Sequence, residues 1–317
     1  MFGLGWLRAL TDARGLLEHA HHGVPRLGEG DTTDDNARAL LYLSLLPEGA
    51  RDEGLVRTYL AFLLHMQKED GRFRNGLTLD GRFEDEGEAE APTGRAVLAL
   101  AAAQRLPPPY AGPAREALLR ALPALEGFTS LRGRAYALLG LLALPKEPFL
   151  EAAEALGEGL LRAFREAEPA WPYPGPLTYA NHRPVEALYA YGLAFRRQEA
   201  VALARRALAF LKEHYFTPGE EGLFFDPVGN RFMARGRDKP LFDQQPIEAK
   251  CALLAHLRFG ERVLAEVAFL WFHGRNRLRA PLVDAFGPMD GLTPHGPNQN
   301  RGAEALLAYL LAWQALV

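Results

Sequence analysis

Residues 303–313, AEALLAYLLAW, contain the pattern that decides the fold. Glu304 stands before an Ala and opens a run in which almost every residue is Ala, Leu or aromatic. A helix that is apolar nearly all round is buried on more than one face. Five further copies of the pattern occur in the chain: ARALLYLSLL (37–46), GRAVLALAAA (94–103), GRAYALLGLLAL (133–144), VEALYAYGLAF (185–195) and IEAKCALLAHL (247–257).

The charged residues that align across these six copies are the anchors of an internal repeat. They follow one another at intervals of about 40 to 60 residues, enough for a helical hairpin and its loops. The anchors are Arg38, Arg95, Arg134, Glu186, Glu248 and Glu304. Amphipathic segments with charge on one face alternate with the apolar runs, at residues 3–20, 51–67, 112–126, 147–167, 197–215 and 259–274.

Six apolar helices that alternate with six amphipathic ones predict an all-α fold. We expect an (α/α)6 toroid of the six-hairpin glycosidase type, with twelve helices in two concentric rings and the anchor helices inside. Residues 1–317 are expected to form a single domain, and some basic and acidic anchors to pair across the inner ring. An open solenoid shares the local pattern, but solenoid repeats are usually uniform and these loops differ in length.

The composition excludes several classes of protein. The formal net charge of −3 comes from interspersed acids and bases, which argues against a nucleic-acid partner. The single cysteine, Cys251, excludes an internal disulfide and a cysteine-based zinc site. No stretch is apolar enough for a membrane span, and charges interrupt the N-terminal apolar pattern, so no signal peptide is predicted. We expect a cytoplasmic protein, and Arg in excess of Lys suits a thermophilic source.

The polar segments of the chain gather directly before the predicted inner helices. Helix N-termini present free N–H groups and the positive end of the helix dipole, which favour carboxylates and hydroxylated or anionic ligands. We therefore predict a polar pocket at the end of the barrel where the inner helices begin. The segments are residues 30–39, 73–96, 170–187, 225–249 and 284–305.

Two of these segments are rich in acids. Asp34, Asp35 and Asn36 either cap a helix, as Asp and Asn often do, or contribute to a site, because they exceed what one cap needs. The acids of residues 84–90 suit a solvated loop, but their position beside Arg95 keeps one of them, Glu88, as a candidate ligand group.

Aromatic and amide groups fill the segment around residue 180. Trp171, Tyr173 and Tyr179 flank Asn181 and His182, and rings beside amide and imidazole groups suit the stacking and hydroxyl bonding of a sugar. The alternative is a loop that simply packs on the rim of the barrel.

The last two segments combine acids with amides. Asp243 and Gln244 precede Gln245 and Pro246, and either of the first two suits a helix cap. The final loop gathers polar groups that exceed the needs of a turn: Asp290, Thr293, His295, Asn298, Gln299, Asn300 and Arg301. The histidines show no HExxH pairing, and His19, His21 and His22 are expected near the end of an outer helix, so no metal site is predicted.

These motifs together resemble an uncharacterised family of six-hairpin α/α-toroid proteins that are associated with or fused to glycosyltransferases and mannoside-processing enzymes. The chain has Ala180 where that family usually has Asp, and EAEAPTGRA (88–96) in place of a segment of the SEDSHGRA type. The matching stretches are TDDNARAL (33–40), DGRFRN (70–75), GRA (94–96), LTYANHRPVEAL (177–188), DQQPIEA (243–249) and DGLTPHGPNQNRGAEALLAYLLA (290–312).

The resemblance implies a role with carbohydrates and, as a possible partner, a glycosyltransferase. A glycoside hydrolase-like enzyme needs two carboxylates around the glycosidic bond, for which Asp35, Asp243 and Asp290 are the candidates. The substrate-binding candidates are Asp34, Asn36, Arg38, Glu88, Arg95, Trp171, Tyr179, Asn181, His182, Gln244, Gln245, His295, Asn298 and Asn300.

No cofactor is expected, and three alternatives stay open. A non-catalytic carbohydrate-binding or scaffold domain is favoured by the two departures. An isoprenoid cyclase would use QKEDGRF (67–73) and DTTDD (31–35). A sugar epimerase needs paired histidine bases, for which only His182 and His295 are available.

Overall fold

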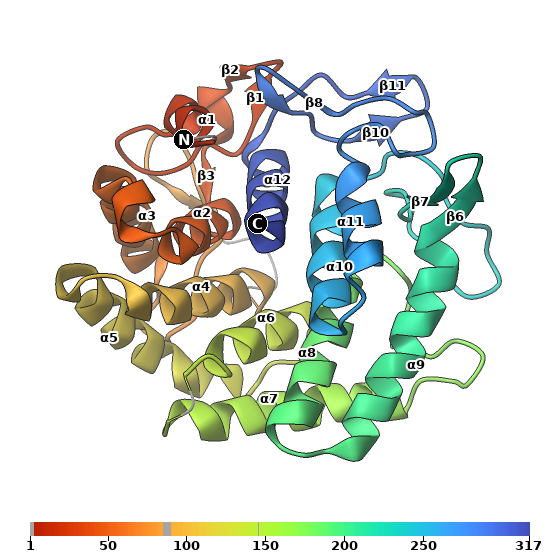
Figure 1. Ribbon diagram of the computed structural model, residues 1–317. Helices are drawn as coiled ribbons and strands as arrows, with labels where there is room; N and C mark the ends of the chain where they lie inside the picture. Colours follow the sequence, from red (N-terminus) through yellow and green to blue (C-terminus); the bar gives the residue numbers. More distant parts are fainter. Residues whose placement is uncertain (1–2, 85–89, 145) are drawn as a thin grey trace. The chain divides into compact units, whose positions relative to one another are not determined.

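The computed structural model describes residues 3–84, 90–144 and 146–317, and this part of the chain is mainly helical (Figure 1). It divides into two compact units. The first contains residues 1–20 and 24–160, and the second contains residues 21–23 and 161–317. The expectation of one domain stays a prediction, and a single calorimetric unfolding transition would support it.

The first unit contains three of the predicted inner helices. Helix α2 packs against α4, and α4 packs against α6, while α3 covers α2 and α5 covers α4. The helices are α1 (Leu4–Leu10), α2 (Thr33–Leu45), α3 (Glu53–Met66), α4 (Glu90–Ala102), α5 (Pro108–Leu125), α6 (Leu131–Leu141) and α7 (Phe149–Arg165), of which α7 continues into the second unit. Short 3-10 turns lie at Leu27–Glu29, Glu48–Ala50 and Ala103–Arg105.

The second unit repeats this arrangement with the remaining inner helices. Helix α10 packs against both α8 and α12, while α9 covers α8 and α11 covers α10. The helices are α8 (His182–Ala194), α9 (Gln198–Tyr215), α10 (Pro246–Arg258), α11 (Arg262–Leu270) and α12 (Ala303–Leu316).

Short strands occupy the segments that precede the inner helices. In the first unit β4 pairs with β3 and β5, and in the second unit three antiparallel hairpins form: β6–β7, β8–β9 and β10–β11. The strands are β1 (Ala20–His21), β2 (Val24–Pro25), β3 (Asp31–Thr32), β4 (Gly76–Leu77), β5 (Phe83–Glu84), β6 (Phe216–Gly219), β7 (Gly222–Phe225), β8 (Val283–Asp284), β9 (Gly287–Pro288), β10 (Leu292–Thr293) and β11 (Gly296–Pro297).

The repeat predicts the inner helices correctly. All six anchors lie in the first two turns of α2, α4, α6, α8, α10 and α12, and the apolar runs behind them are largely buried. The amphipathic segments from residue 51 onward also form helices, although α5 begins four residues early, at Pro108, because proline suits the first helical position.

The prediction of a helix over residues 3–20 is wrong beyond residue 10. The Asp12 carboxylate accepts the backbone N–H groups of Arg14 and Gly15, at 2.7 and 3.1 Å, and so replaces helical hydrogen bonds with a turn. A side chain at Gly15 would also meet Asn36 at 2.8 Å. His19, His21 and His22 consequently lie at strand β1 and its turn, not at the end of an outer helix.

Candidate functional site

The start of α2 places its acids inside the helix, so the interpretation of Asp34, Asp35 or Asn36 as the helix cap is wrong. Thr32 is the N-cap, and its side chain accepts the N–H of Asp35 at 3.3 Å. The Asn36 side chain is buried and holds the preceding segment, accepting the N–H of Leu16 at 2.9 Å. Asn36 therefore supports the local fold, while the two aspartates are available for other contacts.

Acids and bases from α2 and α4 meet in one group. Arg38 contacts the carboxylate of Asp35 directly, and Arg95 on α4 donates to Asp34. The Arg95 guanidinium also lies 4.7 Å from the centre of the Tyr136 ring on α6. The side chain of Asp34 is 23% exposed, whereas that of Asp35 is 3% exposed. Asp34 is thus the carboxylate of this pair that a ligand reaches more easily.

Glu18 adds a third carboxyl group, which sequence reasoning missed. Burial and the negative charge of nearby Asp35 raise its pKa to about 7, while His19 acts in the opposite sense. No local motif marks Glu18, because it lies in a segment that resembles the end of an amphipathic helix. We refer to Glu18, Asp34, Asp35, Arg38 and Arg95 as the carboxylate cluster.

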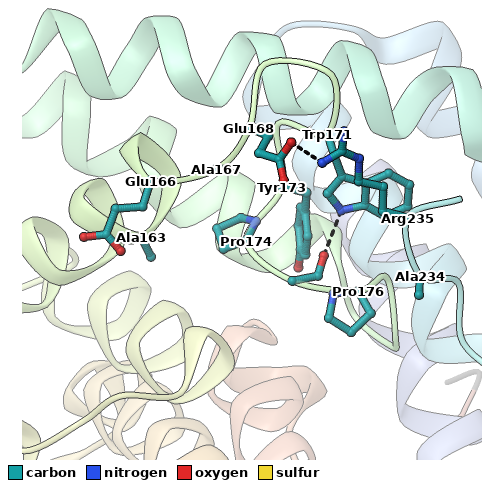
Figure 2. A pocket seen from close by; sticks show the side chains of 11 residues that line it. Ala163, Glu166, Ala167, Glu168, Trp171, Tyr173, Pro174, Pro176, Ala234 and Arg235 are labelled. Carbon is teal, nitrogen blue, oxygen red and sulfur yellow. Dashed lines mark hydrogen bonds and ion pairs between the residues drawn. The ribbon is translucent and has the colours of Figure 1, made fainter.

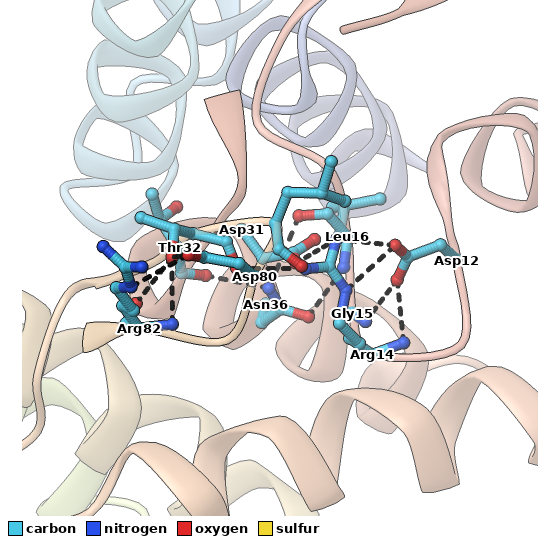
Figure 3. A network of polar contacts seen from close by, with 11 residues as sticks. Asp12, Arg14, Gly15, Leu16, Asp31, Thr32, Asn36, Asp80 and Arg82 are labelled. Atoms are coloured by element: carbon cyan, nitrogen blue, oxygen red, sulfur yellow. Dashed lines mark hydrogen bonds and ion pairs between the residues drawn. The ribbon is translucent and has the colours of Figure 1, made fainter. Parts of the chain in front are cut away.

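A partly buried network around Arg14 fixes the segment that precedes Glu18 (Figure 3). Arg14 donates to the carbonyl oxygens of Thr78 and Leu79, at 3.0 and 2.9 Å, and forms ion pairs with Asp12 at 2.8 Å and Asp31 at 3.3 Å. Burial raises the pKa of Asp31 to about 6, helped by the charge of Asp12. Arg14 thus joins its own segment to Asp31, directly before α2, and to the turn at Thr78 and Leu79.

Of the acids in residues 84–90, the structure describes Glu84 and Glu90. Glu88 lies outside the described residues, and Glu84 is exposed on β5. Glu90 is buried, and its carboxylate accepts the backbone N–H groups of Thr129 and Ser130, at 2.8 and 2.6 Å. Glu90 therefore fixes the entry to α6.

Two anchors of the second unit, Glu186 and Glu248, form ion pairs and a hydrogen bond within that unit. Glu186 pairs with Arg183 on the same helix and with Arg258 at 3.0 Å, and Glu248 accepts the N–H of Ala180. Glu186 and Glu248 are 3% and 1% exposed. The Ala180 backbone is left-handed, with φ of 51°. We refer to Arg183, Glu186, Glu248 and Arg258 as the second cluster.

The aromatic and amide residues before α8 lie in two different places. Asn181 is buried, accepts the N–H of Thr178 at 3.0 Å and donates to the hydroxyl of Tyr215 at 2.7 Å. Tyr179 packs against Ala180, Ile247 and Cys251. Trp171 and Tyr173 instead line a groove of the second unit (Figure 2), to which Tyr179, Gln245 and the final loop do not contribute.

His182 is fully buried, and neither of its ring nitrogens has a hydrogen-bond partner among the described residues. Its ring lies 4.8 Å from that of Tyr215 and 5.7 Å from that of His256. Burial holds the pKa of His182 well below its usual range, and nearby His256 acts in the same direction. His295, by contrast, is exposed, so it forms no buried pair with His182.

The segment before α10 is held by a buried aspartate. Gln244 donates to Asp226 at 2.8 Å and accepts the indole N–H of Trp271 at 2.9 Å, so both ends of its amide are used internally. The N-cap of α10 is Gln245 without a side-chain bond, which shows that the capping interpretation of Asp243 or Gln244 is wrong. Asp243 is exposed in a left-handed conformation, with φ of 60°, and Gln245 is half-buried.

The final polar loop forms hydrogen bonds mainly with itself. The Asp290 carboxylate accepts the N–H of Gly302 at 2.6 Å and so holds the start of α12. The side chain of Asn298 accepts the N–H of Asn300 at 3.2 Å, and that of Asn300 accepts the N–H of His22 at 3.2 Å. These bonds account for much of the unusual polarity that the sequence shows here.

No group of three or more His, Cys, Asp or Glu side chains suited to a metal ion occurs among the described residues. In the same part of the chain, no helix has the length and apolar character that crossing a membrane requires.

Comparisons with known proteins place this chain by its fold. No family model and no curated protein matches the sequence. Cellobiose 2-epimerase from Bacillus thermoamylovorans matches at a TM-score of 0.70 and 9% identity, over 99% of this chain and 96% of that one. A D-mannose isomerase matches at a TM-score of 0.70 and 10% identity, over 99% and 95%.

A family 76 glycoside hydrolase, an α-mannanase from Bacteroides thetaiotaomicron, matches at a TM-score of 0.65 and 10% identity, over 99% of this chain and 93% of that one. At such identities the matches show the fold alone. They confirm the predicted fold class, an all-α (α/α)6 toroid.

Proposed function

We propose that this chain is a carbohydrate-active enzyme that hydrolyses glycosidic bonds at the carboxylate cluster. The observation that carries the proposal is the partly exposed Asp34 beside the buried Asp35 in the first turn of α2, next to two buried arginines. Glu18 lies near enough for the charge of Asp35 to raise its pKa. Glycoside hydrolysis needs one carboxyl group that is protonated and one that is ionised. The similarity of the fold to enzymes that act on sugars supports the same class of substrate.

The two roles follow from the surroundings of each acid. Glu18, with a pKa of about 7, carries a proton in a large fraction of molecules at neutral pH and donates it to the leaving glycosidic oxygen as the bond to the anomeric carbon breaks. Asp34, paired with Arg95, assists the water that attacks this carbon or attacks it directly. The stereochemistry of the product distinguishes the two routes.

The carboxylates predicted from the sequence receive unequal support. Asp35 accepts hydrogen bonds from Arg38 and, at 3.1 Å, from the hydroxyl of Thr32. These contacts support a role in positioning its neighbours and not direct contact with a substrate. The bond from Gly302 supports a role for Asp290 in holding the segment directly before α12. Asp243, which is exposed, has no such contact to support a role. We therefore propose Asp34 ahead of all three.

The experiment tests turnover of cellotetraose, α-1,6-mannotetraose and maltotetraose by the parent and by two variants, Glu18→Gln and Asp34→Asn. Each variant keeps the shape of the side chain but removes the proton transfer or charge, so turnover should fall by roughly 10²–10⁴-fold. Glu126→Gln and Asp238→Asn are matched controls at exposed positions and should keep full activity.

Full turnover in both Glu18→Gln and Asp34→Asn would reject the cluster as the catalytic site. Binding of a sugar by the parent without any turnover would instead favour a non-catalytic carbohydrate-binding or scaffold domain. In that case the partner implied by the resemblance, a glycosyltransferase, is tested by co-purification with the full chain.

A sugar epimerase or isomerase is the second candidate. It is favoured by the neutral, unbonded His182 imidazole beside His256, because an epimerase needs a base that removes a proton from carbon. Incubation with cellobiose or mannose, followed by NMR of the sugar, separates an isomerised product from a hydrolysed one. Loss of isomerisation in His182→Asn, at unchanged melting temperature, would support this candidate over hydrolysis.

A further inference from the structure

The groove in the second unit is a built feature of the fold (Figure 2). Its volume is about 620 Å³, within the range of small-molecule sites in proteins. The last turn of α7 and the loop after it form one side, and Ala234 and Arg235 form the other. The residues that matter most here are Glu166, Glu168, Trp171, Tyr173, Pro176 and Arg235.

Contacts within the chain hold the walls of the groove in place. Leu177 and Met233 exchange two backbone hydrogen bonds of 2.8 Å, which join the loop after α7 to the loop that carries Arg235. The indole N–H of Trp171 donates to the Gly175 carbonyl at 2.8 Å, and its ring meets Phe210 edge to face at 4.9 Å. A site that is ordered in advance loses less entropy when it binds.

The chemistry of the lining suits a neutral, hydroxylated ligand. Trp171 is half-buried and gives the groove an aromatic surface, with Tyr173 and prolines beside it. Glu168 and Arg235 form an ion pair, so together they offer hydrogen-bond acceptors and donors without net charge. The exposed Glu166 adds acceptors for hydroxyl groups. A sugar ring presents this combination of apolar C–H faces and hydroxyl edges.

We propose that this groove binds a segment of a neutral oligosaccharide, with one sugar ring stacked on Trp171. The inference rests on the proposed function, because it assigns the same class of ligand to a second place on the chain. It differs from that function in its residues, all of which lie in the second unit, whereas the carboxylate cluster lies in the first. The two assignments can therefore fail separately.

The test measures binding by calorimetry in the full chain carrying Asp34→Asn, so that no ligand is consumed. The probes are cellotetraose, α-1,6-mannotetraose and maltotetraose, with a proline-rich decapeptide as a ligand of another class. Adding Trp171→Ala should weaken binding of at least one sugar by about tenfold or more. Phe232→Ala removes an exposed ring that is on the loop carrying Arg235 but does not line the groove, and it should change affinity less than twofold.

A further variant, Trp171→Phe, separates loss of stacking from loss of structure. It keeps an aromatic face but not the bond to Gly175, so its affinity should lie between those of the parent and the alanine variant. The proposal is overturned if Trp171→Ala binds the sugars as the parent does, if no sugar binds, or if only the peptide binds. Full turnover in both Glu18→Gln and Asp34→Asn would reject the catalytic assignment but leave this result unchanged.

Discussion

The two units use the same helical repeat with opposite charges at its anchors. In the first unit the anchors are Arg38, Arg95 and Arg134, and two of them hold the aspartates of α2, of which Asp34 is partly exposed. In the second unit the anchors are acids, and both Glu186 and Glu248 are almost completely covered. A shared pattern thus decides where charged groups lie, while the neighbouring loops decide whether a ligand can reach them.

The largest effect on stability is expected in the second cluster. Glu186→Ala removes one carboxylate partner of Arg183, whose side chain is 7% exposed, and so reduces the compensation of a buried charge. Such a loss should lower the free energy of unfolding by about 3–5 kcal/mol. Asp34→Asn should cost less in the same chemical denaturation experiment, because the amide oxygen can still accept from Arg95 and the position is partly exposed. Equal losses would contradict the distinction between the two clusters.

The next effect concerns pH in the first unit. The pKa of Asp31 is raised from 3.8 to about 6, so its contribution to stability is present below pH 3.8 and is lost as the pH rises through 6. Asp31→Asn cannot ionise, and its stability relative to the parent should improve by up to about 3 kcal/mol between pH 4 and pH 7. Melting curves across this range would show parallel profiles if the prediction is wrong.

The second unit should respond to pH in the opposite direction. The pKa of His182 is lowered, so its contribution to stability is present above about pH 6.5 and is lost as the pH falls. His182→Phe should flatten the decline in stability below pH 6.5. Hydrogen exchange of peptides from α8 compares the two proteins directly, and an unchanged acid response would remove His182 as the cause.

A small effect is expected at Asp290, whose carboxylate accepts the N–H of Gly302, the residue directly before α12. Asp290→Ala should lower stability by roughly 0.5–2 kcal/mol, whereas Asp290→Asn, which can still accept the bond from Gly302, should change it little. If Asp290→Asn nevertheless abolished turnover, Asp290 would regain a place beside the carboxylate cluster. The same pair of substitutions at the exposed Asp243 is expected to leave stability unchanged.

The sequence predicted features that depend on residues close together in the chain. The apolar runs and their anchors identify all six inner helices, since helical packing follows local periodicity. The sequence did not identify Thr32 as the N-cap of α2, because Thr, Asp and Asn side chains can all cap a helix and several of them follow one another here. The environments of Glu18 and Gln244 could not be predicted from the neighbouring residues in the sequence, because they depend on burial and on distant partners such as Asp35 and Asp226.

The most direct test of the account is the pKa of Glu18, because the assignment of a protonated acid depends on it. Carbon-13 NMR of the glutamate carboxyl groups, with Glu18→Gln to identify the signal, follows this titration in the full chain. We expect a midpoint near 7 that falls toward the ordinary glutamate value in Asp35→Asn, because a neutral side chain there removes the repulsion. A midpoint near 4.5 in the parent protein would contradict the role of Glu18 as the proton donor.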